Sequence, residues 1–239
     1  MTQLSKLKIL LGLIYLLIVT FVTFLFFYYE IYSYVNADFI KNNRQNIFKY
    51  LDKHIFFNSF IFLIFCIIWF FLLGFGFPLI IVAGFAFGSI LGSVLLLLGF
   101  SFGTLLLYIF ANYYFKDLVF KYFANRYKNL NIHFKNNDFA YLLFLRLVPG
   151  LPSQATSLIP ILFNMNLKNY FFASLIGSAP SIIILVSLVS GISSKVEEGV
   201  NFDINLLSDP QISFPLAALA IMVLVVNYIK KSFFKKKNE

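Results

Sequence analysis

The chain has 239 residues, of which 60% are hydrophobic and 12% are charged, whereas a typical soluble domain is about 25% charged. The formal net charge is +9, with 19 Lys and Arg against 10 Asp and Glu. Because the basic residues flank apolar runs, this composition predicts a protein that spans a bilayer several times. It argues against a soluble domain and against nucleic-acid binding.

Few side chains suit metal or covalent chemistry. Cys66 is the single cysteine and lies inside an apolar run, so it cannot form an intramolecular disulfide. The two histidines, His54 and His133, lie in polar segments without the spacing of metal ligands. No P-loop or GxSxG motif is present. We therefore expect no enzyme activity, no metal and no cofactor.

Five apolar runs are long enough to cross a hydrocarbon core of ~30 Å. They are residues 9–29, 55–73, 93–115, 169–192 and 211–229. The first follows two lysines and has no A-x-A cleavage site after it, so we expect residues 1–54 to be an uncleaved membrane anchor followed by an interfacial segment. Residues 193–239 are predicted to hold an outer loop, the last span and a basic cytoplasmic tail.

Two further apolar segments contain residues that break helices. A straight helix over residues 78–115 would be ~57 Å long, so we expect a short hairpin at 78–92 before the span. The second segment, 139–163, contains RLVPGLP. Its two prolines each remove a backbone donor, and Gly150 between them permits a tight turn. We therefore predict a second hairpin at 139–163.

The distribution of basic residues favours hairpins that return to the side they entered. With a cytoplasmic C-terminus and a returning 139–163 segment, fifteen of the 19 Lys and Arg fall inside, as the positive-inside rule requires. A full span at 139–163, with 78–115 crossing once, gives a balance that violates this rule. The predicted fold class is therefore an all-α integral membrane protein with about five transmembrane helices and two opposed re-entrant hairpins in an inverted repeat.

Arg146 is the one charge within an apolar stretch, and all ten acidic residues lie outside such stretches. An arginine at mid-bilayer costs at least ~2.5–3.5 kcal/mol to insert, so it needs a partner. Carbonyls freed by the prolines, an anionic ligand such as a lipid phosphate, or snorkelling to the inner surface would each serve. The predicted lipid-phosphate site comprises Arg146, Pro149, Gly150, Pro152, Gln154 and Ser157.

Small residues recur at helical spacing in both halves. Gly84, Gly88 and Gly92 form a double GxxxG, which permits close helix approach. Gly177 lies in a similar small-residue pattern in the second half, and Pro180 is able to kink that span. We predict that these residues, together with Pro78, pack the hairpins.

FPLIIVAGFAFGSILG followed by RLVPGLP and GSAP resembles the VTT domain of the DedA and SNARE-associated Golgi protein superfamily, over roughly residues 55–192. The resemblance implies two opposed re-entrant hairpins and a role in moving lipids or lipid-linked phosphates. Its pattern falls on Pro78, Gly84, Gly88, Arg146, Pro149, Pro152, Gly177 and Pro180. Residues 78–92 lack the acidic residue usual in DedA members, so the match is to a bacterial branch related to the yeast Golgi Tvp proteins.

The leading hypothesis is a translocator or scramblase of lipids or lipid-linked phosphates in a bacterial inner membrane, with anionic lipids as partners and oligomerisation left open. A transporter of small solutes or ions is one alternative, although the apolar segments lack the acidic residues and histidines that cation or proton coupling uses. A non-transporting membrane organiser is the other. It would bind anionic lipid through its basic tail and a predicted amphipathic helix at 116–138.

Overall fold

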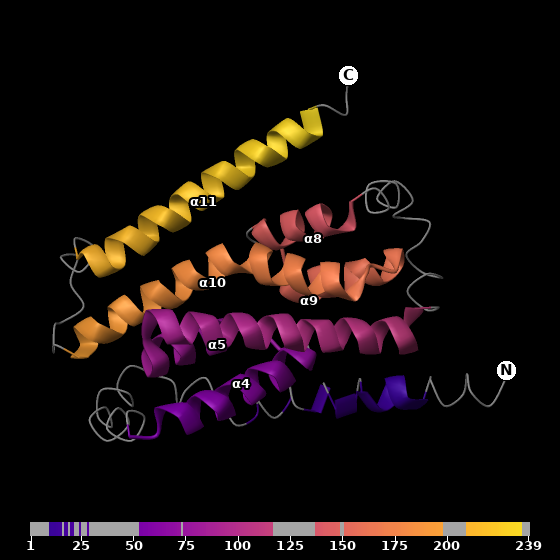
Figure 1. Ribbon diagram of the computed structural model, residues 1–239, viewed down its shortest axis with the longest axis horizontal. Helices are drawn as coiled ribbons and strands as arrows, with labels where there is room; N and C mark the ends of the chain where they lie inside the picture. The colour runs from indigo at the N-terminus through magenta and orange to yellow at the C-terminus, as the bar shows by residue number, and fades with distance from the viewer. Residues whose placement is uncertain are drawn as a thin grey trace.

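The computed structural model describes residues 10–15, 53–72, 74–116, 137–148, 151–197 and 209–235, together with positions 17, 18, 20, 21, 24 and 28. All regular structure in these ranges is helical (Figure 1), as predicted. The elements are α4 (Ile55–Phe71), α5 (Gly76–Tyr114), α8 (Asp138–Leu147), α9 (Ser153–Leu158), the 3-10 helix η1 (Ile159–Phe163), α10 (Leu167–Glu197) and α11 (Pro210–Lys235). The predicted interfacial helix at 116–138 lies almost wholly outside the described residues.

Two helices of the described part are long and apolar enough to cross a membrane, Gly76–Tyr114 and Leu167–Lys195. The helices at Ile55–Phe71 and Pro210–Val226 are apolar but shorter, and the predicted first span is described only at scattered positions. The all-helical class is thus confirmed, while the number of spans stays a prediction.

Helix α5 consists of two antiparallel arms that meet at Gly88. This residue has φ 72° and ψ −172°, a conformation that glycine adopts without the penalty of a Cβ atom. A Cβ on Gly92 would press against the carbonyl oxygen of Ala83 and lie 2.8 Å from its carbon. Nine residues of straight helix would separate these positions by ~13.5 Å. The chain therefore reverses at Gly88, inside the segment predicted as a hairpin.

The first arm of α5 pairs with α4 rather than standing alone. Phe62 of α4 packs against Phe87, and Phe70 packs against Phe100, each with 4.9 Å between ring centroids. Phe100 lies twelve residues beyond Gly88, or ~18 Å along the second arm. Helix α4 thus passes Gly88 near its middle and ends partway along the second arm, and the chain then turns back into Gly76. The arrangement differs from the predicted separate span at 55–73, because residues 55–87 form one helical hairpin.

Helices α8 and α9 form the second hairpin, and the two ends of this segment meet. The side chain of Asn137 caps α8 by accepting a hydrogen bond from the Ala140 N–H. Asp138 then accepts hydrogen bonds from the Asn166 N–H at 3.3 Å and the Asn169 side chain at 2.8 Å. Because Asn166 and Asn169 follow the segment, the chain leaves α8 and comes back to where it started, while the predicted re-entry of 139–163 into a membrane stays a prediction.

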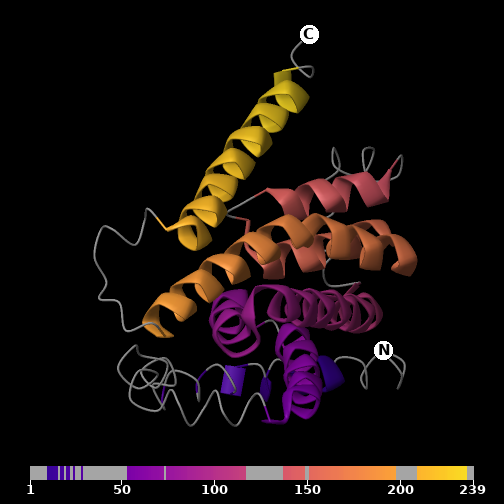
Figure 2. The same cartoon turned by 60° about the vertical axis from the view of Figure 1, so that its left-hand side comes forward.

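Helix α10 lies antiparallel to the second arm of α5 (Figures 1 and 2). Val186 contacts the Gly92 position at one end, and Tyr170 stacks on Tyr108 at the other, with 4.5 Å between centroids. A helical hairpin thus precedes each of the two long helices, which run in opposite directions, while the predicted inverted repeat stays a prediction. Helix α11 packs on the outer side of α10, where Gln211 contacts Gly191.

The predicted packing glycines lie at these crossings. A Cβ on Gly84 would be 2.7 Å from Val189 and 2.9 Å from the Val186 carbonyl oxygen, and one on Gly177 would be 2.9 Å from the Leu143 carbonyl oxygen. Pro78 lies in the first turn of α5 and Pro180 lies inside α10. Pro78 costs no helical hydrogen bond at that position, whereas Pro180 leaves the Ile176 carbonyl without its usual donor.

Candidate functional site

Arg146 lies near the end of α8 and is only 8% exposed. Its Nη1 donates to Thr156 Oγ1 at 3.0 Å and to the Ser153 carbonyl at 3.4 Å. Its Nη2 donates to three hydroxyls: Ser157 at 3.1 Å, Tyr170 at 3.3 Å and Ser174 at 3.4 Å. The guanidinium is therefore held inside the protein between α8, α9 and α10, which excludes the snorkelling alternative.

The hydroxyls around Arg146 are oriented by their own donor bonds. Thr156 and Ser157 donate to the Ser153 carbonyl at 3.0 and 2.7 Å, and Tyr170 donates to the Ser157 carbonyl at 3.2 Å. Each oxygen therefore turns its lone pairs toward the arginine. The first turn of α9, which begins after Pro152, brings these groups together. It supplies one carbonyl to the arginine, that of Ser153, whereas the prediction was of carbonyls freed by the prolines.

The positive charge of Arg146 is not neutralised by a carboxylate within the described residues, where Lys195 and Asp209 form an ion pair with each other. The ring of Phe100 lies 4.7 Å from the guanidinium carbon, a cation–π contact that offsets part of the burial cost. The Nε atom is buried and has no hydrogen-bond partner among the residues that the structure describes. The site therefore keeps one net charge and one donor that the protein leaves unused.

A cavity of about 350 Å³ adjoins Arg146, within the range of small-ligand pockets. The connections of both hairpins reach it, through Gly76 of the first and Val148 and Leu151 of the second. Helices α10 and α11 close another side with Ser178, Ser181, Leu219 and Met222. The only charged residue among its lining residues is Arg146. The two hairpins thus approach each other around a single cation in an otherwise largely apolar space.

A protein-family comparison matches the VTT domain over residues 75–191. This range holds Arg146 and all of its hydrogen-bond partners. The chain carries a VTT domain over these residues, which are just under half of its length. It is a membrane protein, as the family and the two long apolar helices indicate. The match begins later than the predicted boundary at residue 55, and the proposed relation to the Tvp branch stays a prediction.

Among curated proteins, the chain is similar to the uncharacterized protein YqeD of Bacillus subtilis strain 168. The two are 34% identical over 105 residues, which is 43% of this chain and 50% of the relative. The chain thus spans about half the length of that curated relative. No solved structure matches the chain.

The structure brings together some of the predicted VTT-domain site residues. Arg146 and Ser157 are in direct contact, and Pro152 precedes the first turn of α9. Gln154 accepts a hydrogen bond from Ser153 at 3.3 Å and does not line the cavity. Pro149 and Gly150 lie outside the described residues. The role of each predicted residue in binding phosphate stays a prediction.

Sequence reasoning missed Tyr170 and Ser174, which lie on α10 and complete the arginine's partners. A usable signal was present in the sequence. Tyr170, Ser174 and Ser178 recur every four residues in a run that is otherwise apolar, so they share one face of a helix. A stripe of polar side chains facing inward is a reasonable search pattern for the partners of a buried cation.

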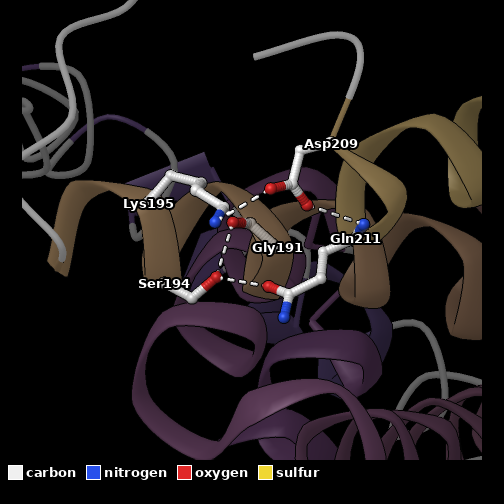
Figure 3. Close-up of polar contacts among 5 residues, drawn as sticks. All are labelled: Gly191, Ser194, Lys195, Asp209 and Gln211. Atoms are coloured by element: carbon white, nitrogen blue, oxygen red, sulfur yellow. Dashed lines mark hydrogen bonds and ion pairs between the residues drawn. The ribbon is translucent and has the colours of Figure 1, made fainter.

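A second polar cluster joins the end of α10 to the start of α11 (Figure 3). Lys195 forms an ion pair with Asp209 at 2.8 Å. The Ser194 hydroxyl lies 2.9 Å from the Gly191 carbonyl oxygen and 2.6 Å from Gln211 Oε1, and it donates to one of these two acceptors. Hydrogen bonds from Lys195 and from the Gln211 backbone N–H hold the pKa of Asp209 below its ordinary value. The cluster fixes α11 against α10 at the end far from Arg146.

Proposed function

We propose that this protein moves lipids or lipid-linked phosphates across a bilayer, with Arg146 attracting the phosphate. The observation that supports the proposal is the buried guanidinium of Arg146, which borders a cavity. It donates to hydroxyls instead of a carboxylate, and its Nε has no partner among the described residues. A buried charge without a counter-ion is costly, and a phosphate oxygen would supply both the missing charge and the missing acceptor.

The proposal includes a specific membrane placement. The hairpin at 55–87 enters from the outside and the hairpin at 138–163 enters from the inside, so their connections meet within the membrane beside the cavity. Non-helical backbone at that depth is tolerated where it lines a cavity, and paired inverted hairpins around a central site are the architecture of many transporters. The positive-inside rule then puts the C-terminus in the cytoplasm of a bacterial cell, with about four spans beside the two hairpins in its inner membrane.

The test is movement of a tail-labelled anionic phospholipid between the leaflets of proteoliposomes. Wild-type protein should accelerate movement over protein-free vesicles, and Arg146→Gln should abolish most of the acceleration because the amide carries no charge. Lys168→Gln is the matched control, since Lys168 is an exposed cation on the same helix that contacts Arg146. Each variant is first checked for an unchanged melting temperature in detergent.

Three outcomes would count against the proposal. They are wild-type vesicles that behave like empty ones, an Arg146→Gln variant that keeps the full rate, and equal losses in Arg146→Gln and Lys168→Gln. Uptake of a water-soluble anion without lipid movement would favour the small-solute transporter. Loss of cellular function on deleting the basic tail, with none in Arg146→Gln, would favour a membrane organiser.

A further inference from the structure

Ser178 is a second polar group that faces the same cavity. Its side chain is 6% exposed and lines the cavity, and it has no hydrogen-bond partner within the described part of the chain. It lies one turn beyond Ser174, which accepts from Arg146. Its neighbour Gly177 packs so closely on α8 that an added Cβ would be 2.8 Å from the Arg146 Cβ. Ser178 therefore belongs to the wall that holds the guanidinium.

The unused donors in this wall are few. Four of the five guanidinium N–H groups belong to Nη1 and Nη2, which are bonded to the protein, and the fifth, on Nε, has no partner. The Ser178 hydroxyl adds one further donor. The other serine that lines this side, Ser181, lies 3.7 Å from the Met222 sulfur as a weak donor. Among the described residues, the donors without a partner at this wall are therefore Oγ of Ser178, which borders the cavity, and the enclosed Nε of Arg146.

Charge limits what such a cavity can accept. A ligand with one negative charge neutralises Arg146, whereas a dianion leaves a net negative charge among apolar walls. A zwitterion brings a cation that finds no carboxylate among the lining residues. Because uncompensated charge is strongly disfavoured in a low-dielectric environment, the singly charged headgroup should bind best.

We propose that the cavity selects lipids whose headgroup is a single monoanionic phosphodiester without a cation, with the Arg146 guanidinium supplying the compensating charge and Ser178 Oγ donating to one non-bridging oxygen. The proposal rests on the function proposed above and names its substrate class. The cavity is lined by Ile80 on α5 and Met222 on α11 as well as by Arg146 and Ser178. A diester needs space beyond its phosphate for two groups, because one ester carries the glyceryl tails and the other carries the headgroup alcohol.

The experiment compares three tail-labelled lipids in proteoliposomes at pH 8. Phosphatidylglycerol is the monoanionic diester, phosphatidylethanolamine is the zwitterion, and phosphatidic acid is a monoester that approaches two charges. Phosphatidylglycerol should move at least about tenfold faster than the other two. Ser178→Ala should slow it about tenfold, which is the expected loss for one hydrogen bond to a charged group.

Two further variants make the test specific. Ser187→Ala deletes the same hydroxyl from α10 at a position that does not line the cavity, and it should leave all three rates unchanged. Ser178→Asp supplies a carboxylate next to Arg146, so the cavity becomes neutral. This variant should lose the preference for phosphatidylglycerol and should move phosphatidylethanolamine faster than phosphatidylglycerol.

The outcomes separate this proposal from the function on which it rests. Equal acceleration of the three lipids, an unaffected Ser178→Ala variant, or a Ser178→Asp variant that keeps the anion preference would each overturn the selectivity while lipid movement stands. If no lipid moves, the proposed function fails. Selectivity is then tested by a binding measurement on the protein in detergent. Short-chain phosphatidylglycerol should raise the melting temperature of the protein more than short-chain phosphatidylethanolamine or phosphatidic acid does. Equal shifts in melting temperature would refute the selectivity.

Discussion

Gly92 offers a quantitative test of the hairpin at Gly88, because it is where the two arms of α5 touch. A Cβ at this position would overlap the Ala83 carbonyl oxygen, lie 2.8 Å from the Ala83 carbon and lie 3.3 Å from a Val186 methyl. The first two neighbours are backbone atoms of the opposite arm, so a change of side-chain rotamer cannot relieve the overlap. Gly92→Ala must therefore push the two arms apart or shift α5 as a whole.

The expected cost of Gly92→Ala follows from these contacts. Overpacking by a methyl group in a well-packed core typically costs 1–3 kcal/mol, and a clash with backbone places this site near ~3 kcal/mol. Alanine favours helix over glycine by up to ~1 kcal/mol, which leaves a net loss of ~2 kcal/mol. For a chain of this size, that corresponds to a decrease in melting temperature of ~4–8 °C.

The single cysteine supplies the assay. Cys66 is fully buried, with 0% exposure, so a thiol-reactive dye should label it only as the helices around α4 separate on heating in detergent. Gly76→Ala is the matched control from the first arm of the same helix, because its Cβ would meet only the Phe70 ring at 3.7 Å and 3.8 Å. A melting temperature for Gly92→Ala within 1 °C of the value for Gly76→Ala would refute the close approach of the arms.

Three other predictions concern the arginine, the α10–α11 cluster and the membrane placement. Tyr170→Phe removes an acceptor of Arg146 and a donor to the Ser157 carbonyl, so it should cost ~2 kcal/mol in the same thiol assay; an unchanged melting temperature would show that the hydroxyl is dispensable. The lowered pKa of Asp209 means that its ion pair stabilises the fold above the ordinary carboxyl pKa of ~3.9 and that this contribution is lost as the pH falls through the lowered value. The melting temperatures of wild type and Asp209→Asn should therefore converge only in acid, and a difference that stays constant with pH would contradict the assignment. In a Cys66→Ala background, an impermeant maleimide should label Pro210→Cys in intact cells and Lys168→Cys only after permeabilisation, whereas labelling of both from outside would contradict the proposed topology.

The sequence was sufficient for the features that depend on local chemistry. A 38-residue apolar stretch cannot be one straight span, and among its glycines Gly88 takes the conformation that reverses the chain. RLVPGLP interrupts the helix at the predicted position, and α9 follows Pro152 directly. In both cases, the length of an apolar run or the loss of backbone donors determines the outcome without knowledge of the tertiary contacts.

The features that depend on tertiary contacts were harder to predict from the sequence. Residues 55–73 are apolar throughout, so nothing in their pattern distinguishes a complete span from one arm of a hairpin. The distinction comes from the contact of Phe70 with Phe100 and the hydrogen bond from Trp69 Nε1 to the Phe75 carbonyl at 2.8 Å, which close the turn. Likewise, Ser174 is 28 residues from Arg146 in sequence, and only the packing of α10 on α8 brings them together.

The chemistry of the arginine's partners gives the strongest argument that its charge serves a ligand. A carboxylate would neutralise Arg146 permanently, and an incoming anion would then have to displace that carboxylate or bind without charge compensation. Hydroxyls and a backbone carbonyl hold the guanidinium in place through dipoles and leave its charge available. A purely structural arginine gains nothing from this choice, since an acidic residue on α9 or α10 would stabilise it more. Under the proposed function, the absence of acidic residues from the apolar segments and the hydroxyl partners of Arg146 have one common explanation, a cation whose counter-ion arrives and leaves with the substrate.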